Sequence, residues 1–403
     1  MRASARHALA LLTGALAAAP APAAAAPLRA PVDVEQRVAA AVAAARRAPD
    51  GPGRAAARAA AAAGATRATP PLTAPRRFDL LGLRWARGAA HVEVRVQRAD
   101  GRWTRWVEAP PAEQAPAAGA ASAPIWTGAA RRYQLRGAHG TALPRGLRVR
   151  FVAVPRPARA PVARAAAGRP AIVPRAGWDP TNACRPRVAP RYGRIDLAFV
   201  HHTVTLASYT RAEAPAVVLA ICRFHRDGNG WHDIGYNLLV DRYGTVYEGR
   251  AGGVDQPVIG AQAAGWNGVS TGVAVIGAYA AAPPPAAAER ALARVLAWKL
   301  AGAGVPAQGT VAETSSGGAQ NRWGAGTRVR FARIAGHRDG VLTSCPGAAL
   351  AARLPVVRAR AAALHAIPRA LLTASPIGGT LPPGGPAWLT GRLALAGGRS
   401  ARR

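Results

Sequence analysis

Residues 230–250 of this chain, GWHDIGYNLLVDRYGTVYEGR, decide its fold class. The segment from Tyr236 to Val240 is apolar and typical of a buried strand, Arg242-Tyr-Gly is a turn, and a second strand follows. Strand character recurs on both sides of this segment, in residues 195–201 and 272–279. These segments predict the strands of one sheet.

Helical segments lie between and after these strands. Residues 213–226 and 286–301 carry apolar side chains at helical spacing, and residues 350–366 predict a further helix. Strands interleaved with helices are typical of an α/β layer structure. We therefore expect a mixed central β-sheet flanked by helices over residues 171–367.

The segment before this domain has a different pattern. Period-two alternation bounded by turn residues recurs in residues 91–96, 103–107 and 147–154, which predicts a smaller all-β, sandwich-like domain over residues 77–155. It shows no catalytic constellation. Trp103, Trp106 and Trp126 are candidates for contact with wall polymers or, as the alternative, core residues.

The N-terminus has the pattern of a secretory signal peptide, with a charged start, a short apolar run and an Ala-x-Ala exit near Ala26. No later segment has the ~18 uninterrupted apolar residues that a membrane span needs, so we expect a secreted, wall-associated protein. The remaining expected divisions are a signal peptide at 1–26, a flexible Ala/Arg/Pro-rich leader at 27–76, a linker at 156–170 and a Gly/Pro-rich tail at 368–403.

The formal net charge is +34, and Lys299 is the only lysine. Such charge favours a polyanionic partner, such as nucleic acid or an anionic cell wall. The arginines are scattered instead of forming one stripe, so we take the codon usage of a GC-rich genome as the main cause of the charge.

The cysteines number three, which leaves one sulfur over if two are bonded in an exported protein. Cys184 precedes the first strand of the α/β domain and Cys222 lies on its first helix, so we expect these two to form a disulfide. Cys345 then needs another role, such as a metal ligand, a nucleophile or a bond to a partner chain.

Two stretches carry candidate chemistry. Val200-His-His-Thr closes a strand, and residues 336–347 read GHRDGVLTSCPG. Imidazole and thiolate are ligands that zinc prefers, and a site with three protein ligands keeps a fourth position for water. The spacing of His337 and Cys345 alone is only a weak indication of a metal.

The chain resembles the peptidoglycan recognition protein family, also called type 2 N-acetylmuramoyl-L-alanine amidases, over roughly residues 174–354. Ordered blocks carry the resemblance: Arg175-Ala-Gly-Trp, His201-His-Thr, Asp233-Ile-Gly-Tyr-Asn, Gly260-Ala-Gln-Ala, and Gly336-His-Arg-Asp to Cys345-Pro-Gly. The resemblance implies zinc-dependent hydrolysis of the amide bond between N-acetylmuramic acid and L-alanine. It also implies that peptidoglycan is the partner, and we expect a monomer with no nucleic acid partner.

The same resemblance assigns roles to individual residues. It makes His201, His337 and Cys345 the zinc ligands, with Tyr236 and Thr343 as catalytic side chains beside the metal. His202 falls at a position without a ligand, and His225 and His232 match no metal position. The expected substrate pocket is lined by Trp231, Asn237, Arg250, Gln262, Trp266 and Asn267. Gln262 stands where many relatives carry histidine, and we expect it to contact substrate.

Two alternatives stay open. A recognition protein without catalysis shares the fold, but members that only bind peptidoglycan typically replace the cysteine ligand, which is present here as Cys345. A cysteine hydrolase would use Cys345 as nucleophile and His337 as base, yet Cys345 precedes a proline and does not open a helix in the papain-like manner.

Overall fold

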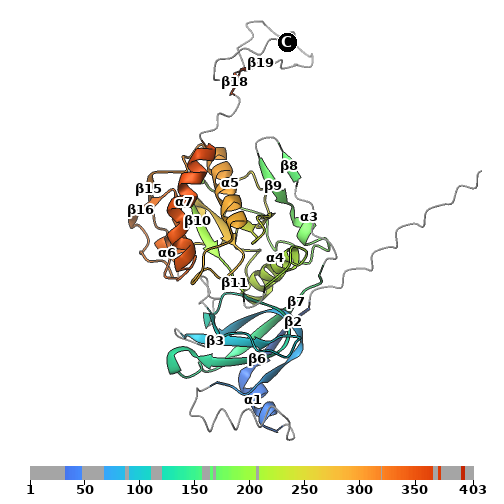
Figure 1. Ribbon diagram of the computed structural model, residues 1–403. Coiled ribbons are helices and arrows are strands. Elements are labelled where there is room, and N and C mark those ends of the chain that lie inside the picture. Colours follow the sequence, from blue (N-terminus) through green and yellow to red (C-terminus); the bar gives the residue numbers. More distant parts are fainter. Residues whose placement is uncertain are drawn as a thin grey trace, which may run out of the picture.

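A computed structural model shows an all-β unit and an α/β unit stacked on each other (Figure 1). The structure describes residues 32–47, 68–86, 90–109, 120–156, 164–166, 169–205, 208–318, 320–365, 371–373 and 392–394. The expected signal peptide at 1–26 lies outside the described residues. Among those residues, no helix combines the length and apolar character needed to cross a bilayer.

The α/β unit is built on a seven-stranded mixed sheet, which confirms the expected fold class. Its central strands β17, β10, β14 and β12 run parallel, and β13 pairs with β12 in the antiparallel hairpin predicted from residues 230–250. In order across the sheet the strands are β17 (Ile334–Gly336), β10 (Leu197–His202), β14 (Ser270–Val275), β12 (Leu238–Val240), β13 (Val246–Glu248), β9 (Arg169–Val173) and β8 (Arg164–Ala166). The expected linker at 156–170 thus contains β8 and the first residues of β9.

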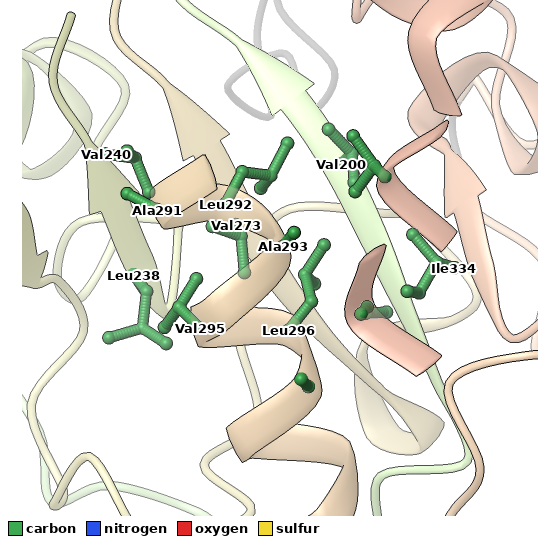
Figure 2. Close-up of a cluster of buried hydrophobic side chains, with 14 of the residues drawn as sticks. Val200, Leu238, Val240, Val273, Ala291, Leu292, Ala293, Val295, Leu296 and Ile334 are labelled. Carbon is green, nitrogen blue, oxygen red and sulfur yellow. The ribbon is translucent and has the colours of Figure 1, made fainter. Parts of the chain in front are cut away.

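Helices cover both faces of this sheet. On one face, α5 (Ala286–Gly302) presents Leu292, Val295 and Leu296 to Val200 and Val273 (Figure 2), and α7 (Ala348–His365) packs beside α5. The other face is covered by α4 (Ala214–Arg223), which continues into a π-helical turn, Phe224–Gly228. Burial of these apolar stripes drives the packing of the layers.

Smaller elements complete the α/β unit. They are α3 (Arg175–Trp178), α6 (His337–Gly340), the short 3₁₀ turn Asn267–Val269, and a hairpin of β15 (Thr310–Thr314) and β16 (Arg328–Ala332), which the sequence patterns did not predict. In the expected Gly/Pro-rich tail, β18 (Leu371–Thr373) pairs with β19 (Arg392–Ala394).

The all-β unit forms a connected eight-stranded sheet, in agreement with the expected sandwich-like domain. Its long strands, β2 (Leu72–Trp85) and β6 (Ile125–Gly137), slip register near Phe78, and such irregularities bend strands so that a sheet can curve around one core. The all-β unit also contributes β1 (Val32–Arg37), β7 (Arg148–Ala153), β3 (Val92–Gln97), β4 (Val107–Ala109) and β5 (Ala120–Ala121), and the eighth strand comes from the α/β unit. A 3₁₀ turn, Ala138–Gly140, follows β6.

The expectation of a flexible leader over 27–76 is wrong for part of that segment. β1 pairs antiparallel with β7, helix α1 (Val38–Arg47) follows, and β2 begins at Leu72. Val38 and Ala41 are buried in the core of the all-β unit. The stabilising contacts come from β7, more than a hundred residues along the chain, so local composition gave little sign of them.

The two units share a core instead of being separated by an open linker. β11 (Val204–Thr205), which follows β10, pairs in parallel with Ile125 and Trp126 of β6 and so adds a strand to the other unit's sheet. Figure 1 shows α4 on the side of the α/β unit that faces β2 and β7, and Phe224 packs with Leu80 and Trp126. Trp126 is therefore a core residue of the junction.

A buried carboxylate reinforces this junction. Asp79, whose side chain is fully buried, pairs with Arg156 at 2.8 Å and accepts a hydrogen bond from the Val154 amide at 3.0 Å. Arg156 also pairs with Glu213 of the α/β unit at 2.9 Å. Burial raises the pKa of the Asp79 carboxyl, and the hydrogen bond from Val154 and the charge of Arg77 oppose that rise. The ion pairs thus connect both units through one acidic side chain.

Candidate metal centre

The parallel strands β10 and β17 bring two histidines together. Val200 lies opposite Gly336, so His201 and His337 follow at neighbouring strand ends. Their rings are 4.3 Å apart between centroids, and both side chains are fully buried. Because side chains alternate along a strand, His201 and His202 point to opposite faces of the sheet.

Cys345 reaches the histidines on the loop after α6. Its Sγ lies 3.8 Å from Nδ1 of His201, and the ligand atoms of His201, His337 and Cys345 all lie within 4.8 Å of one another. The backbone amide of His202 donates to Sγ at 3.3 Å, and the Cys345 amide donates to Oγ1 of Thr343 at 3.1 Å. These hydrogen bonds hold the sulfur toward the histidines.

The three side chains fit a metal ion such as zinc. A tetrahedral zinc ion with bonds of ~2.0–2.3 Å to nitrogen and sulfur separates its ligands by about 3.3–3.6 Å. The 3.8 Å between Nδ1 and Sγ is close to that range. The other cluster of this kind in the described residues, Cys184, Cys222 and Asp233, contains a disulfide, so its sulfurs are not available as ligands.

Gln262 sets the orientation of His201. Its Oε1 accepts a hydrogen bond from Nε2 of His201 at 2.6 Å, which leaves Nδ1 with a lone pair facing Cys345. The Gln262 amide donates to Oγ of Ser270 at 2.9 Å, and that hydroxyl donates to the Trp266 carbonyl at 2.7 Å. All three side chains are buried. Gln262 was expected to contact substrate, but the structure places it behind the candidate metal ligand, as a hydrogen-bond acceptor of the kind that orients such histidines.

Burial favours the neutral form of His337 and of His202. It lowers the pKa of His337 to about 3, and a neutral imidazole is the form that binds a metal. Burial also lowers the pKa of His202 to about 4, with His337 as a smaller cause. Nδ1 of His202 accepts the amide hydrogen of Tyr279 at 3.1 Å, which agrees with its expected position outside the ligand set.

Tyr236 and Thr343 lie beside the candidate ligands. The Tyr236 ring is 5.2 Å from the His201 ring and 5.5 Å from the His225 ring, between centroids. Thr343 is half-buried and accepts the Cys345 amide hydrogen, so its own hydroxyl hydrogen remains available for donation.

His225 is a buried residue with contacts inside the domain, which agrees with its lack of a match to any metal position. Its Nδ1 accepts the Gly235 amide hydrogen at 3.1 Å, and its ring packs 4.6 Å from the ring of Trp231. Burial, with a smaller contribution from Arg250, lowers its pKa to about 3. His232 is exposed and lies outside the cluster of candidate ligands.

Most of the other residues expected to line the substrate pocket hydrogen-bond to or pack against other residues of the α/β unit. Asn237 donates to the Val258 carbonyl and accepts from the Gly272 amide, while Asn267 accepts from the amides of Gln262 and Ala263. Trp266 is fully buried against Phe331. Trp231 is half-buried, and half-buried Arg250 lines a small cleft of about 170 Å³ together with Arg191 and Gly260.

The structure joins Cys184 and Cys222 in a disulfide with Cα atoms 6.2 Å apart. The bond ties the loop before β10 to α4. Nearby, Arg175 pairs with Asp233 at 3.2 Å and donates to the Cys184 carbonyl at 2.7 Å. The disulfide and the ion pair therefore anchor the same loop, and Cys345 is the remaining thiol.

Comparison with known families gives two matches along the chain. Residues 191–348 match the family model described as N-acetylmuramoyl-L-alanine amidase, and residues 22–166 match the model described as Rv3811 N-terminal galactose-binding domain-like. The first match contains all three candidate metal ligands. The second covers most of the all-β unit.

Curated relatives match the α/β unit. The human N-acetylmuramoyl-L-alanine amidase is 35% identical over 189 residues, which cover 45% of this chain and 27% of the human protein. Peptidoglycan-recognition protein SC1a of Drosophila melanogaster is 41% identical over 85 residues, which cover 21% of this chain and 44% of that protein. The chain thus spans less than two thirds of the length of these relatives.

Solved structures give a similar set of names. Drosophila PGRP-LB is 24% identical with a TM-score of 0.35, and the match covers 45% of this chain and 91% of that chain. Peptidoglycan recognition protein LE, solved in complex with tracheal cytotoxin, is 25% identical with a TM-score of 0.36, covering 46% and 92%. Residues 191–348 of this chain thus match the N-acetylmuramoyl-L-alanine amidase family, and the curated relatives of the chain include both amidases and peptidoglycan-recognition proteins.

Proposed function

We propose that this protein is a zinc-dependent N-acetylmuramoyl-L-alanine amidase, which hydrolyses the amide bond between the lactyl group of N-acetylmuramic acid and the first residue of the peptidoglycan stem peptide. The observation that carries the proposal is the convergence of His201, His337 and Cys345 within 4.8 Å in a domain of this family. Two nitrogens and one sulfur are a donor set suited to zinc, with one position left for water or substrate.

The chemistry divides between the metal and the protein. A zinc ion held by His201, His337 and Cys345 would lower the pKa of a bound water to ~7 and polarise the substrate carbonyl. Gln262 holds His201 in the tautomer whose Nδ1 lone pair faces the site. The amide of His202 stabilises the negative charge of the Cys345 thiolate.

Two hydroxyl groups are placed to assist the reaction. Tyr236 lies against His201, and a phenol stays protonated at neutral pH, so it can donate a hydrogen bond to the oxygen of the amide as negative charge develops there. Thr343 supplies a second hydroxyl next to Cys345. Both are half-buried or buried, which strengthens such hydrogen bonds relative to water.

The second candidate is a recognition protein that binds peptidoglycan without cutting it, because several relatives are named recognition proteins. The presence of Cys345 favours the enzyme. A cysteine hydrolase is the weaker reading, because Cys345 is buried and its sulfur forms a three-donor cluster with His201 and His337, a set that suits a metal ion better than a nucleophile with access to substrate.

We also infer that the protein works outside the cytoplasm as a monomer. The Cys184–Cys222 disulfide supports an oxidising compartment, in agreement with the signal-like N-terminus. All three candidate ligands come from one chain, so no second copy is needed to complete the centre.

The test is product identity. The full chain is incubated with purified peptidoglycan, and the soluble products are identified by mass spectrometry. The proposal predicts stem peptides with a free L-alanine amino terminus and glycan strands of unchanged length. Cleavage at any other bond, or sedimentation of the protein with peptidoglycan without release of any product, would replace the amidase with another hydrolase or with a recognition protein.

A further inference from the structure

A pocket of about 600 Å³ lies at the junction of the two domains. One wall is the loop between β3 and β4, with Arg98, Arg102, Trp103 and Arg105, and the other wall comes from the α/β domain, including Arg242. Neither domain alone forms this pocket. Its volume is within the range of small-molecule and cofactor sites, so it has room for a short peptide or sugar segment.

The lining of the pocket is cationic. Its four arginines are exposed, and none of them forms an ion pair with an acidic residue in the described part of the chain. None of the described lining residues is acidic. Asp100, the acidic residue closest in sequence, accepts a hydrogen bond from the Arg102 amide and does not line the pocket. Guanidinium groups match carboxylates and phosphates with paired hydrogen bonds, so the pocket suits an anion.

The arginine loop is held in place. The Thr104 amide donates to the Val96 carbonyl at 2.9 Å, and the Val96 amide donates to Oγ1 of Thr104 at 3.1 Å. Trp103 forms an isolated antiparallel β-bridge with Gln97. Arg95 stacks on the rings of Trp103 and Trp106, at 5.0 and 4.7 Å from their centroids. Trp103 and Trp106 are therefore half-buried, and Trp103 adds an aromatic surface to the cationic wall.

The opposite wall is connected to the metal-bearing strand. Gly277 donates to Oγ1 of Thr203 at 3.1 Å, and the amide of Tyr279 donates to His202. Thr205 also lines the pocket. It follows His201 by four residues, and four residues of extended chain span about 13 Å. A peptide of four extended residues spans a similar ~13–14 Å. The pocket and the metal centre are thus within reach of one stem peptide.

From this arrangement we propose that the interdomain pocket binds a carboxylate of the peptidoglycan stem peptides, so that both domains engage the substrate. The inference rests on the proposed function for the identity of the polymer. The pocket arginines bind a carboxylate of a stem peptide, and the metal centre acts on the muramoyl bond at the start of the same peptide.

The test measures binding separately from cleavage. The full chain is compared with an Arg98→Gln/Arg102→Gln/Arg105→Gln variant for sedimentation with purified insoluble peptidoglycan, in chelator so that hydrolysis does not contribute. A matched variant, Arg131→Gln/Arg290→Gln/Arg294→Gln, removes the same charge from exposed arginines away from the pocket. We expect the pocket variant to bind about tenfold more weakly and the matched variant within about twofold of the unaltered chain. Thermal unfolding of both variants checks their fold.

Chemically modified walls identify the anion. On peptidoglycan with amidated carboxyl groups, the unaltered chain should bind only as well as the pocket variant. After removal of phosphate polymers from the wall, the unaltered chain should still bind more tightly than the pocket variant. Three results would each overturn the proposal. The two triple variants could lose the same amount of binding. The stronger binding of the unaltered chain could survive amidation of the wall, or it could disappear when the phosphate polymers are removed. Cleavage of a small soluble muramoyl peptide is measured in parallel. If no form cuts it while the binding difference persists, the amidase proposal fails and the anion site stands.

Discussion

Oε1 of Gln262 lies 2.6 Å from Nε2 of His201, inside the core of the α/β domain. The two residues are 61 positions apart, and β10 and the loop before β14 bring them together. This hydrogen bond fixes which nitrogen of His201 faces His337 and Cys345. It makes Gln262 the principal orienting residue of the candidate metal centre.

Replacing Gln262 with leucine should weaken metal binding by about 10- to 100-fold, because His201 loses the acceptor that holds its tautomer and orientation. Competition with a chromogenic chelator measures the affinity. Ser270→Ala is the matched control: it removes the partner of the Gln262 amide and keeps the acceptor to His201, so its effect should be smaller. Equal affinities for Gln262→Leu and the unaltered chain would refute the role of Gln262.

Tyr236→Phe should lower turnover on peptidoglycan by about 10²–10³-fold, because the hydroxyl donor to the developing oxyanion is lost. The phenylalanine ring keeps the packing between His201 and His225, so metal content should not change. Steady-state rates and metal analysis on the same preparations separate the two effects. Loss of metal together with activity would mean that Tyr236 acts through the structure of the centre.

The domain junction predicts a coupled pair of substitutions. A Cβ atom at Gly82 of β2 would lie 2.0 Å from the Phe224 ring, so Gly82→Ala should lower the free energy of unfolding by ~1–3 kcal/mol. Phe224→Leu removes part of that ring and should offset some of the cost. Urea denaturation of the single and double variants then gives a coupling of at least about 0.5 kcal/mol. Strictly additive effects would show that the two domains do not pack through this contact.

His225 predicts a pH dependence of stability. Its folded pKa of about 3 is below the unfolded value of ~6.5, so its contribution is fully present above pH ~6.5 and is lost as the pH falls toward 3. Between these limits it contributes a slope of up to about 1.4 kcal/mol per pH unit. Denaturation between pH 7 and pH 4, with chelator present, should show a smaller slope for His225→Gln. An unchanged slope would exclude His225 as a source of the acid sensitivity.

The sequence was sufficient to predict those elements whose pattern is local. The strands β10, β12 and β14 and the helices α4, α5 and α7 were expected within a few residues, because each has a strong apolar period of its own. β1 and α1 were missed because their stability comes from β7 and the core around Val38, not from their Ala- and Arg-rich composition.

The candidate site shows the same division. The motif spacing and family resemblance led to His201, His337 and Cys345, which the structure brings together. The position of Gln262 behind His201 and the arginines of the β3–β4 loop at the domain junction depend on how distant segments pack. The sequence contained one indication of the latter, since Trp103 and Trp106 alternate with Arg102 and Arg105 in a domain otherwise without candidate chemistry.

Metal dependence of stem-peptide release tests the central claim most directly. The full chain and a Cys345→Ala variant are assayed on purified peptidoglycan for new amino termini, first as prepared, then with chelator, and then with zinc restored, while bound zinc is counted per chain. A zinc-dependent amidase should hold one zinc ion in the active chain, lose release with chelator and recover it with zinc, and its Cys345→Ala variant should release nothing. Release that continues with no bound metal, or undiminished release by Cys345→Ala, would contradict the central claim.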